Sequence, residues 1–431
     1  MISIRFIINK LTNPLYRNTL IYTVTDAISK GLAFFVLPFI SYYLDPDQLG
    51  IAANFDVLVS ILSLVAGLAI VNGLPYFYYD RTKEDIAVLI FNLILIFSTI
   101  LITSVGIIFL SSDLIDTNLH LGLSLQLLTI LNVLCVLLTG LGTTVYRLEN
   151  KPIPFSVLQI LQTLINLSLL IWLVIGQKQQ AVGKIYSMVG TNIVMSIIHT
   201  TLLFKRGFIK VKLKSNSIKE LLRFGLPLLP HSLSFWLKGG MDKVLLTTYC
   251  GLAANGLYSM ALSFGAMYSI FATAFSNAYV PYLQERLSKI NDSNRISEHR
   301  SIVVWSYKVM MIFGLLYGFV LVTCWFAIKY VLSDKYIGSL QFLPWLLLAQ
   351  FLQACYSMVV QFPYSQKKTF GLGAITFSSS VIQLFLTYLF VSTMGITGIN
   401  VSLVLGTLIT LVGVWWYSNR VYPLPWFNIK F

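Results

Sequence analysis

Charged residues are scarce in this chain of 431 residues. They make up 11% of it, against about 25% in ordinary soluble domains. Hydrophobic residues make up 57%, and the mean hydropathy is +0.78. A soluble protein has no way to hide that much apolar surface from water. The composition therefore excludes a soluble globular class and indicates an integral membrane protein.

The chain also lacks the short motifs that bind nucleotides or metals. It contains no GxGxxG turn, no Walker loop and no HExxH helix, so we expect neither a metal nor a bound cofactor. We predict no catalytic residues and no enzyme activity. The four cysteines show no CxxC spacing and are expected to be small buried hydrophobic residues: Cys135, Cys250, Cys324 and Cys355.

Basic residues outnumber acidic ones, giving a net charge of +14, but no soluble segment interleaves them with aromatic residues. We therefore expect no nucleic-acid partner. Lysine and arginine are concentrated in alternate loops, as is typical of the cytoplasmic side of a membrane protein. This pattern predicts that both termini lie in the cytoplasm. The loops on the opposite side carry only Lys178, Lys184, Lys329 and Lys335.

Apolar runs long enough to cross a bilayer recur along the whole chain. The loops expected outside the membrane are short, which argues against a glycan polymerase with a large external catalytic loop. The runs predict an all-α polytopic protein with twelve transmembrane helices, near residues 18–44, 49–77, 86–110, 119–146, 153–175, 181–204, 224–249, 253–283, 301–329, 339–364, 370–393 and 396–418.

The twelve helices are expected to form two halves. We predict an N-terminal six-helix bundle over 1–204, a basic cytoplasmic linker over 205–223 and a C-terminal six-helix bundle over 224–431. Gly50 and Gly256 open similar motifs 206 residues apart, and Pro75 and Pro281 show the same offset. Six helices per half give both halves the same orientation, related by a pseudo-two-fold axis along the membrane normal. Transporters of this build hold substrate between their halves.

Two of the predicted spans carry charges near mid-depth, where each charge costs about 2.5–3.5 kcal/mol. The first contains Asp26 and Lys30, which are four residues apart and share a helix face. The seventh, with the sequence SFWLKGGMDKVLL at its centre, contains His231, Lys238 and Asp242 on one stripe. Charges inside a membrane usually serve function.

Two interpretations of these charges stay open. In the first, Asp26 pairs with Lys30 and Lys238 pairs with Asp242, and both pairs are structural. In the second, the lysines bind an anionic cargo such as a diphosphate headgroup, and the carboxylates couple its movement to protons or Na⁺. Glycine and proline in the same two spans favour a moving, cavity-lining element.

Four further polar sites are less specific. Lys308 is expected to lie close to an interface, and Arg147 and His199 near the cytoplasmic mouth, where Arg147 is a candidate for anion capture. His231 is either a proton site or a partner of a carbonyl freed by the nearby prolines. Amides within the spans contact either sugar or other helices: Gln159, Gln162, Asn166, Gln353 and Gln383.

Three motifs occur in a characteristic order. FGLPLLPHSLSFWLKGGMDKVLLTTYCGLAANGLYSMA covers 224–261, NAYVPYLQE covers 277–285, and LDPDQLGIAANF at 44–55 is the first-half counterpart. In these motifs, its length and its two-half build, the chain resembles the polysaccharide-transport branch of the multidrug/oligosaccharidyl-lipid/polysaccharide exporter superfamily. It looks most like a Wzx-type flippase of O-antigen or capsule repeat units.

The resemblance implies a cargo, an undecaprenyl-diphosphate-linked oligosaccharide, that crosses the bacterial inner (plasma) membrane from the cytoplasmic to the outer leaflet. It also implies coupling to a proton or Na⁺ gradient and work beside glycan polymerase machinery. A drug–cation antiporter of the same superfamily is the alternative, although lysines repel cationic cargo. On this basis the headgroup site is Lys30, Lys238, Lys308 and Arg147, and the coupling residues are Asp26, Asp242 and His231.

Overall fold

A computed structural model describes residues 14–68, 70–291, 295–366 and 368–426. Within these ranges the chain is helical and contains no strand, which confirms the all-α polytopic class. It divides into two compact units, Met1–Trp236 (unit 1) and Leu237–Phe431 (unit 2).

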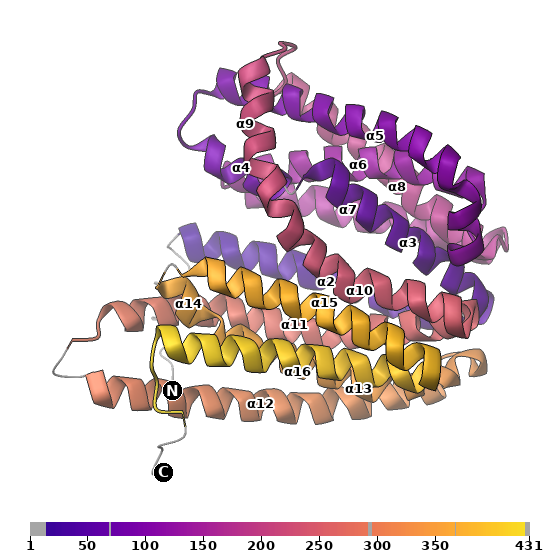
Figure 1. Ribbon diagram of the computed structural model, residues 1–431. Helices are drawn as coiled ribbons and strands as arrows, with labels where there is room; N and C mark the ends of the chain where they lie inside the picture. Colours follow the sequence, from indigo (N-terminus) through magenta and orange to yellow (C-terminus); the bar gives the residue numbers. More distant parts are fainter. Residues whose placement is uncertain (1–13, 69, 292–294, 367, 427–431) are drawn as a thin grey trace. The chain divides into compact units, whose positions relative to one another are not determined.

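Unit 1 is built from long helices that run side by side with a short helix across one end (Figure 1). Helix α6 packs against α3, α5 and α8, and α7 packs against α2 and α8. The helices are α2 (Pro14–Tyr43), α3 (Pro46–Gly67), α4 (Ile70–Tyr78), α5 (Lys83–Leu119), α6 (Leu123–Leu148), α7 (Pro152–Leu170), the π-helical turn Ile171–Gly176, α8 (Gln180–Lys205) and α9 (Ser215–Gly225).

Unit 2 follows from α10 (Leu229–Cys250), which begins in unit 1 and ends in unit 2. Its strongest packing joins α16 to α15 and α13, and α11 also packs against α13. The remaining helices are α11 (Leu252–Ser288), α12 (Arg295–Tyr330), the 3₁₀ segment Asp334–Gln341, α13 (Leu343–Val359), α14 (Gln361–Ser365), α15 (Thr369–Met394) and α16 (Ile396–Val421).

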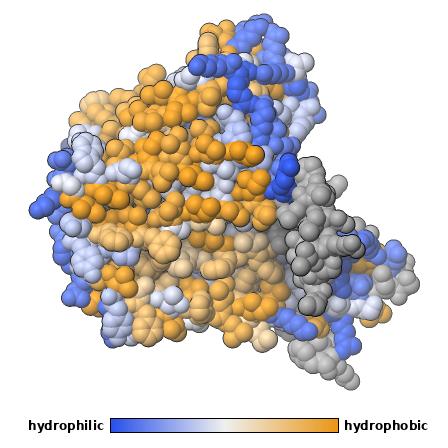
Figure 2. Space-filling model, turned by 180° about the vertical axis from the view of Figure 1, so that it is seen from behind, coloured by the Kyte–Doolittle hydropathy of each residue, from blue (hydrophilic) through white to orange (hydrophobic). Residues whose placement is uncertain are grey.

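Every one of the twelve predicted spans has a helical counterpart, and 11 helices of the described residues are long and apolar enough to cross a membrane. The helix missing from that set is α10, which carries Lys238, Asp242 and Lys243. Large apolar side chains point outward, including Leu110 (92% exposed) and Phe370 (91%). Figure 2 shows hydrophobic side chains over most of one face and hydrophilic ones toward its edges. Such a surface suits contact with lipid.

The second predicted span, near 49–77, is interrupted in the structure. Helix α3 ends at Gly67 and α4 begins at Ile70, because Leu68 adopts a left-handed backbone conformation with φ 47°. A left-handed leucine is unfavourable. Its side chain is 4% exposed within the apolar core of unit 1, so packing stabilises the break.

The segment predicted as a linker, 205–223, contributes to unit 1. Asn92 of α5 donates to the carbonyl of Lys212 (2.9 Å) and accepts from the amide of Lys214 (3.1 Å). The second half of the segment lies in α9, which packs against α4 and α5 and buries Leu221 completely. The boundary between the compact units therefore falls after Trp236, whose indole donates to Ser60 of α3 (3.0 Å).

The predicted internal repeat agrees with where two helices begin. Helix α3 begins at Pro46 and α11 at Leu252, which are 206 residues apart, the same offset as Gly50 and Gly256. Both glycine motifs lie in the first turns of these helices. The sequence repeat therefore marks equivalent helices in the two units.

Replacement of Gly398 by alanine is expected to destabilise unit 2. A Cβ at Gly398 would lie 2.1 Å from the backbone oxygen of Phe390, at the turn that joins α15 to α16. Because backbone cannot rotate away, Gly398→Ala should cost about 1–3 kcal/mol and lower the melting temperature of the purified protein. Gly373→Ala in α15 is the matched control, since its Cβ would meet nothing within 4 Å. Equal melting temperatures for the two variants would contradict the prediction.

Candidate functional site

The central charges of the seventh span make separate contacts within unit 2. Lys238 of α10 donates from Nζ to the hydroxyl of Thr410 on α16 (2.7 Å). Asp242 is only 3% exposed and accepts from the hydroxyl of Thr387 on α15 (3.2 Å). No ion pair between Lys238 and Asp242 occurs among the described side chains. The polar side chains of three helices therefore meet around α10.

The geometry of α16 explains why Thr410 can receive the lysine. The threonine hydroxyl donates to the carbonyl of Gly406 in its own helix (2.8 Å), so its lone pairs remain for Lys238. Gly406 also leaves room for Gln383 of α15, because a Cβ there would lie 2.4 Å from the glutamine Cγ. Gln383 is thus buried next to the aspartate cluster, and its contact is with another helix. An ammonium, a carboxylate and hydroxyls here form a site that suits a small cation or an anionic group.

Asp26 and Lys30, the first predicted charge pair, also have different surroundings in the structure. Asp26 of α2 accepts a hydrogen bond from the amide of Gln159 on α7 (2.9 Å), and Lys30 is exposed one turn further along α2. The described ion pairs do not join these two residues. The described side chains therefore form no direct ion pair between Asp26 and Lys30 or between Lys238 and Asp242, although the latter two still interact electrostatically.

The other predicted site residues lie on α12, α6 and α10. Lys308 is exposed on α12. Arg147 is exposed in the last turn of α6 and stacks on the ring of Phe155, 4.7 Å from its centroid. His231 lies in α10, but its side chain is outside the described part of the structure. Within unit 2, Lys308 and Lys238 therefore lie on different helices, α12 and α10.

His199, which was expected near the cytoplasmic mouth, lies in the last two turns of α8 and is buried. Its side chain is 1% exposed, on the face of α8 that packs against Gly142 of α6. Two predicted polar residues lie on α7 nearby, and both contact helix α8. Gln162 donates to Asn192 (3.4 Å), and Asn166 donates to Thr191 (3.4 Å).

Many basic residues near the helix ends form ion pairs with acidic residues. Lys30 and Lys238 are in none of the described ion pairs and so differ from them. Arg286, beyond the apolar part of α11, donates from Nε to Glu298 (2.7 Å), and this hydrogen bond raises the pKa of Arg286. The other pairs are Arg81 with Glu220, Arg206 and Lys151 with Glu149, Lys210 with Glu84, and Lys289 with Glu285.

Cysteine and metal chemistry are limited within the described ranges. Cys135, Cys324 and Cys355 are buried free thiols and Cys250 is half-buried, as predicted for small hydrophobic residues. The described residues contain no group of three or more histidine, cysteine, aspartate or glutamate side chains that suits a metal ion.

Two solved folds are similar to this chain over most of its length. A lipid II flippase, MurJ, in an inward closed conformation matches with a TM-score of 0.73 and 14% identity, covering 92% of this chain and 87% of that one. A multidrug resistance MATE family transporter in an inward-facing conformation matches with a TM-score of 0.68 and 16% identity, covering 91% and 94%. The chain thus shares its fold with both of these proteins.

Sequence comparison finds relatives that also match over most of their length. A Haemophilus influenzae protein of the Lsg locus is 22% identical over 389 residues, covering 86% of this chain and 92% of that protein. An uncharacterized membrane protein of the same organism is 21% identical over 384 residues, covering 86% and 89%. The family model for polysaccharide biosynthesis proteins matches residues 15–286. The chain is a multi-pass membrane protein that belongs to the polysaccharide biosynthesis protein family.

Proposed function

We propose that this protein flips a lipid-linked oligosaccharide across the bacterial inner membrane. The observation that carries the proposal is the combination of a polysaccharide biosynthesis family match over 15–286 with a MurJ-like fold over 92% of the chain. The first supplies the biosynthetic context and the second supplies a fold that moves lipid-linked cargo in a relative. The cargo is an undecaprenyl-diphosphate-linked repeat unit, moved from the cytoplasmic to the outer leaflet, with both termini of the protein in the cytoplasm.

The proposed cargo contacts are cations that lie within membrane-spanning helices. Lys30 is exposed in α2, where lipid contact would cost about 2.5–3.5 kcal/mol. A water-filled cavity or a bound diphosphate removes that cost, and ammonium groups bind phosphate as point charges. Lys238 offers a second ammonium on α10, oriented by Thr410. Lys308 and Arg147, which are both exposed, are proposed as weaker contacts of this anion-binding set.

Coupling to a proton or Na⁺ gradient is proposed for the carboxylates. Asp242 is buried among hydroxyl groups, and hydroxyl and carboxylate oxygens are ligands that a small hard cation accepts. Asp26, hydrogen-bonded to Gln159, is the candidate carboxylate in unit 1. His231 is retained as a proton site on its place in α10. Glycan polymerase machinery would use the flipped repeat.

The test is the leaflet that holds lipid-linked oligosaccharide in cells lacking this protein. Extracted repeats should accumulate on the cytoplasmic side, and restoring the gene should relieve the accumulation. If no repeat accumulates and the cells instead become sensitive to cationic dyes, the flippase proposal is wrong and the MATE-like fold points to a drug–cation antiporter.

A further inference from the structure

Helices α6 and α8 of unit 1 bury an unusual line of polar side chains where they face each other. The six residues are nine-tenths or more buried, yet they lie in the middle of two apolar spans. Buried polar groups of native proteins are nearly always hydrogen-bonded, to protein or to water. We name the set the polar seam: Asn132, Cys135 and Thr139 of α6, and Asn192, Ser196 and His199 of α8.

Several atoms of the polar seam have no protein partner among the described residues. Both ring nitrogens of His199 are unpartnered, as are Nδ2 of Asn132 and Oγ1 of Thr139. His199 cannot turn away, because it fills the space opposite Gly142, where a Cβ would lie 2.2 Å from Nδ1. Four orphan atoms on one helix–helix seam indicate that water molecules complete the hydrogen bonding.

The polar seam continues into a pocket of unit 1. Asn192 donates to Asn132 (2.8 Å) and accepts from Gln162 of α7 (3.4 Å). One turn further along α7, Asn166 donates to Thr191 (3.4 Å) and also lines a cavity of about 110 Å³.

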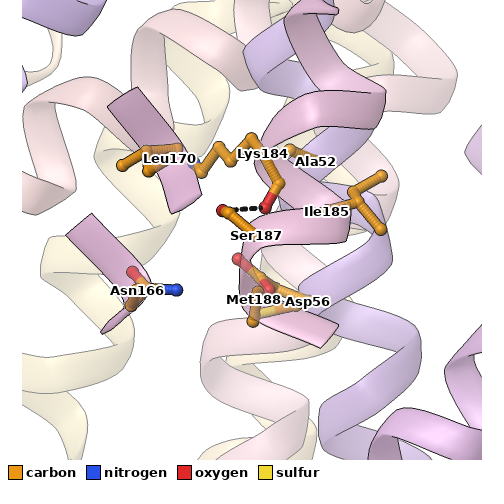
Figure 3. Close-up of a pocket in the computed structure, with 8 residues that line it drawn as sticks. All are labelled: Ala52, Asp56, Asn166, Leu170, Lys184, Ile185, Ser187 and Met188. Carbon is orange, nitrogen blue, oxygen red and sulfur yellow. Dashed lines mark hydrogen bonds between the residues drawn. The ribbon is translucent and has the colours of Figure 1, made fainter. Parts of the chain in front are cut away.

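The pocket itself combines charged and polar side chains from three helices. In Figure 3, Asp56 of α3 and Asn166 of α7 point toward one another across it, and Lys184 and Ser187 of α8 lie along its other side. The pocket is partly open and lies at the end of unit 1 where α7 gives way to α8. On the proposed topology this is the outer end, so the polar seam leads inward from it.

The spacing of the polar seam suits a file of water. Asn132 and Gly142 are ten residues apart on α6, about 15 Å along a helix. Thr139 lies between them, with its hydroxyl available to relay a hydrogen bond to the ring opposite Gly142. A histidine with two unpartnered nitrogens can accept a proton on one and release it from the other.

We propose that the polar seam is a hydrated proton-access pathway that leads from the Asp56 pocket to His199. The proton enters at the pocket, moves along water and the Thr139 hydroxyl, and is taken up by the imidazole, which becomes a cation. No bond other than those to the moving proton is formed or broken. Its use in energy coupling rests on the proposed function, but the pathway itself does not depend on the cargo.

The groups that face His199 are few. Helix α6 presents Tyr146, whose ring centroid is 6.4 Å away, and Cys135 further along the polar seam. Helix α3 contributes Asp56 at the pocket end, and α7 contributes only neutral amides. Arg206, at the end of α8, stacks on Tyr146 and is paired with Glu149. The imidazolium would therefore form without a close carboxylate and would release its proton readily.

The test is deuterium exchange at the C2 carbon of histidine, followed by mass spectrometry of purified full-length protein over a range of pH. This exchange requires a ring that takes up a proton and is reached by water. His199 should exchange at a rate comparable to that of His120, which is exposed. Thr139→Val should slow exchange at His199 by about tenfold or more, because helix opening becomes the remaining route.

Thr129→Val is the matched control. Thr129 is buried on the same helix, but its hydroxyl already donates to the carbonyl of Leu125 (2.9 Å), so its loss should leave exchange at His199 unchanged. Asn192→Leu, which breaks the link toward the pocket, should slow exchange as Thr139→Val does. The proposal is overturned if His199 shows no C2 exchange over the period in which His120 exchanges, or if Thr139→Val and Thr129→Val give equal rates. The measurement uses no glycolipid, so a failed flippase assay leaves it unaffected.

Discussion

Lys238→Ala is expected to reduce glycolipid flipping by about 30-fold or more. Removing a half-buried charge from a site that binds an opposite charge costs about 2–5 kcal/mol, and each 1.4 kcal/mol is about a factor of ten. Because Thr410 already holds the ammonium in place, little side-chain entropy is lost when the diphosphate binds. Lys238→Arg keeps the charge but changes its shape and should retain part of the activity. The measurement is glycan export in cells and flipping by purified protein in vesicles.

Two controls separate a role in cargo binding from a role in folding. Lys243→Ala removes a lysine from the same helix, five residues on, and should export glycan at a normal level. Thr410→Val removes only the hydrogen bond that holds Lys238 and should reduce flipping less than Lys238→Ala does. Normal export by folded Lys238→Ala protein would make this lysine structural and remove it from the cargo site.

Most of the fold could be predicted because membrane-spanning helices are recognisable in a sequence from their length and apolar composition. All twelve predicted segments are helical, and the 206-residue repeat agrees with the starts of α3 and α11. The break at Leu68 could not be predicted, since it occurs inside an apolar run and depends on packing in the core of unit 1. Helix α9 was not predicted, because its charged residues resemble those of a linker. Its buried face nevertheless includes Leu221.

The candidate site was predictable in its residue types and less so in its partners. Spacing along one helix correctly placed Lys238 and Asp242 in one span, but it left open a direct ion pair between them that the described side chains do not form. Their actual partners, Thr410 and Thr387, are 172 and 145 residues away. Threonine is common in membrane helices, so nothing in a single sequence marks these two.

The residues of the polar seam are recognisable in the sequence by their helical spacing, although they were not predicted as a set. Asn132, Cys135 and Thr139 recur on one face of their helix, and Asn192, Ser196 and His199 do the same on theirs. A search for polar residues at helical spacing within apolar spans would have found both faces. It could not have shown that they face each other, because that depends on the packing of α6 against α8.

Asp242→Asn is expected to abolish the response of transport to the ion gradient while leaving the protein folded. The amide keeps the shape of the side chain and can still accept from Thr387. It carries no charge, so it neither gains a proton nor attracts a cation. A gradient can shift the transporter only through a difference in ion binding between its states. Flipping by purified protein in vesicles should therefore show a ratio of rates, with and without a gradient, of about one.

The melting temperature of Asp242→Asn distinguishes a role of Asp242 in ion coupling from a role in helix packing. If Asp242 served mainly to hold α10 against α15, its loss of charge would lower the melting temperature. We expect the melting temperature to stay level or rise, because a buried carboxylate is costly to desolvate and a neutral amide is less so. Asp113→Asn, on an exposed part of α5, is the matched control and should leave both gradient response and stability unchanged. A gradient response that survives in Asp242→Asn would move the coupling site to Asp26, whose carboxylate accepts a hydrogen bond from Gln159 of a neighbouring helix.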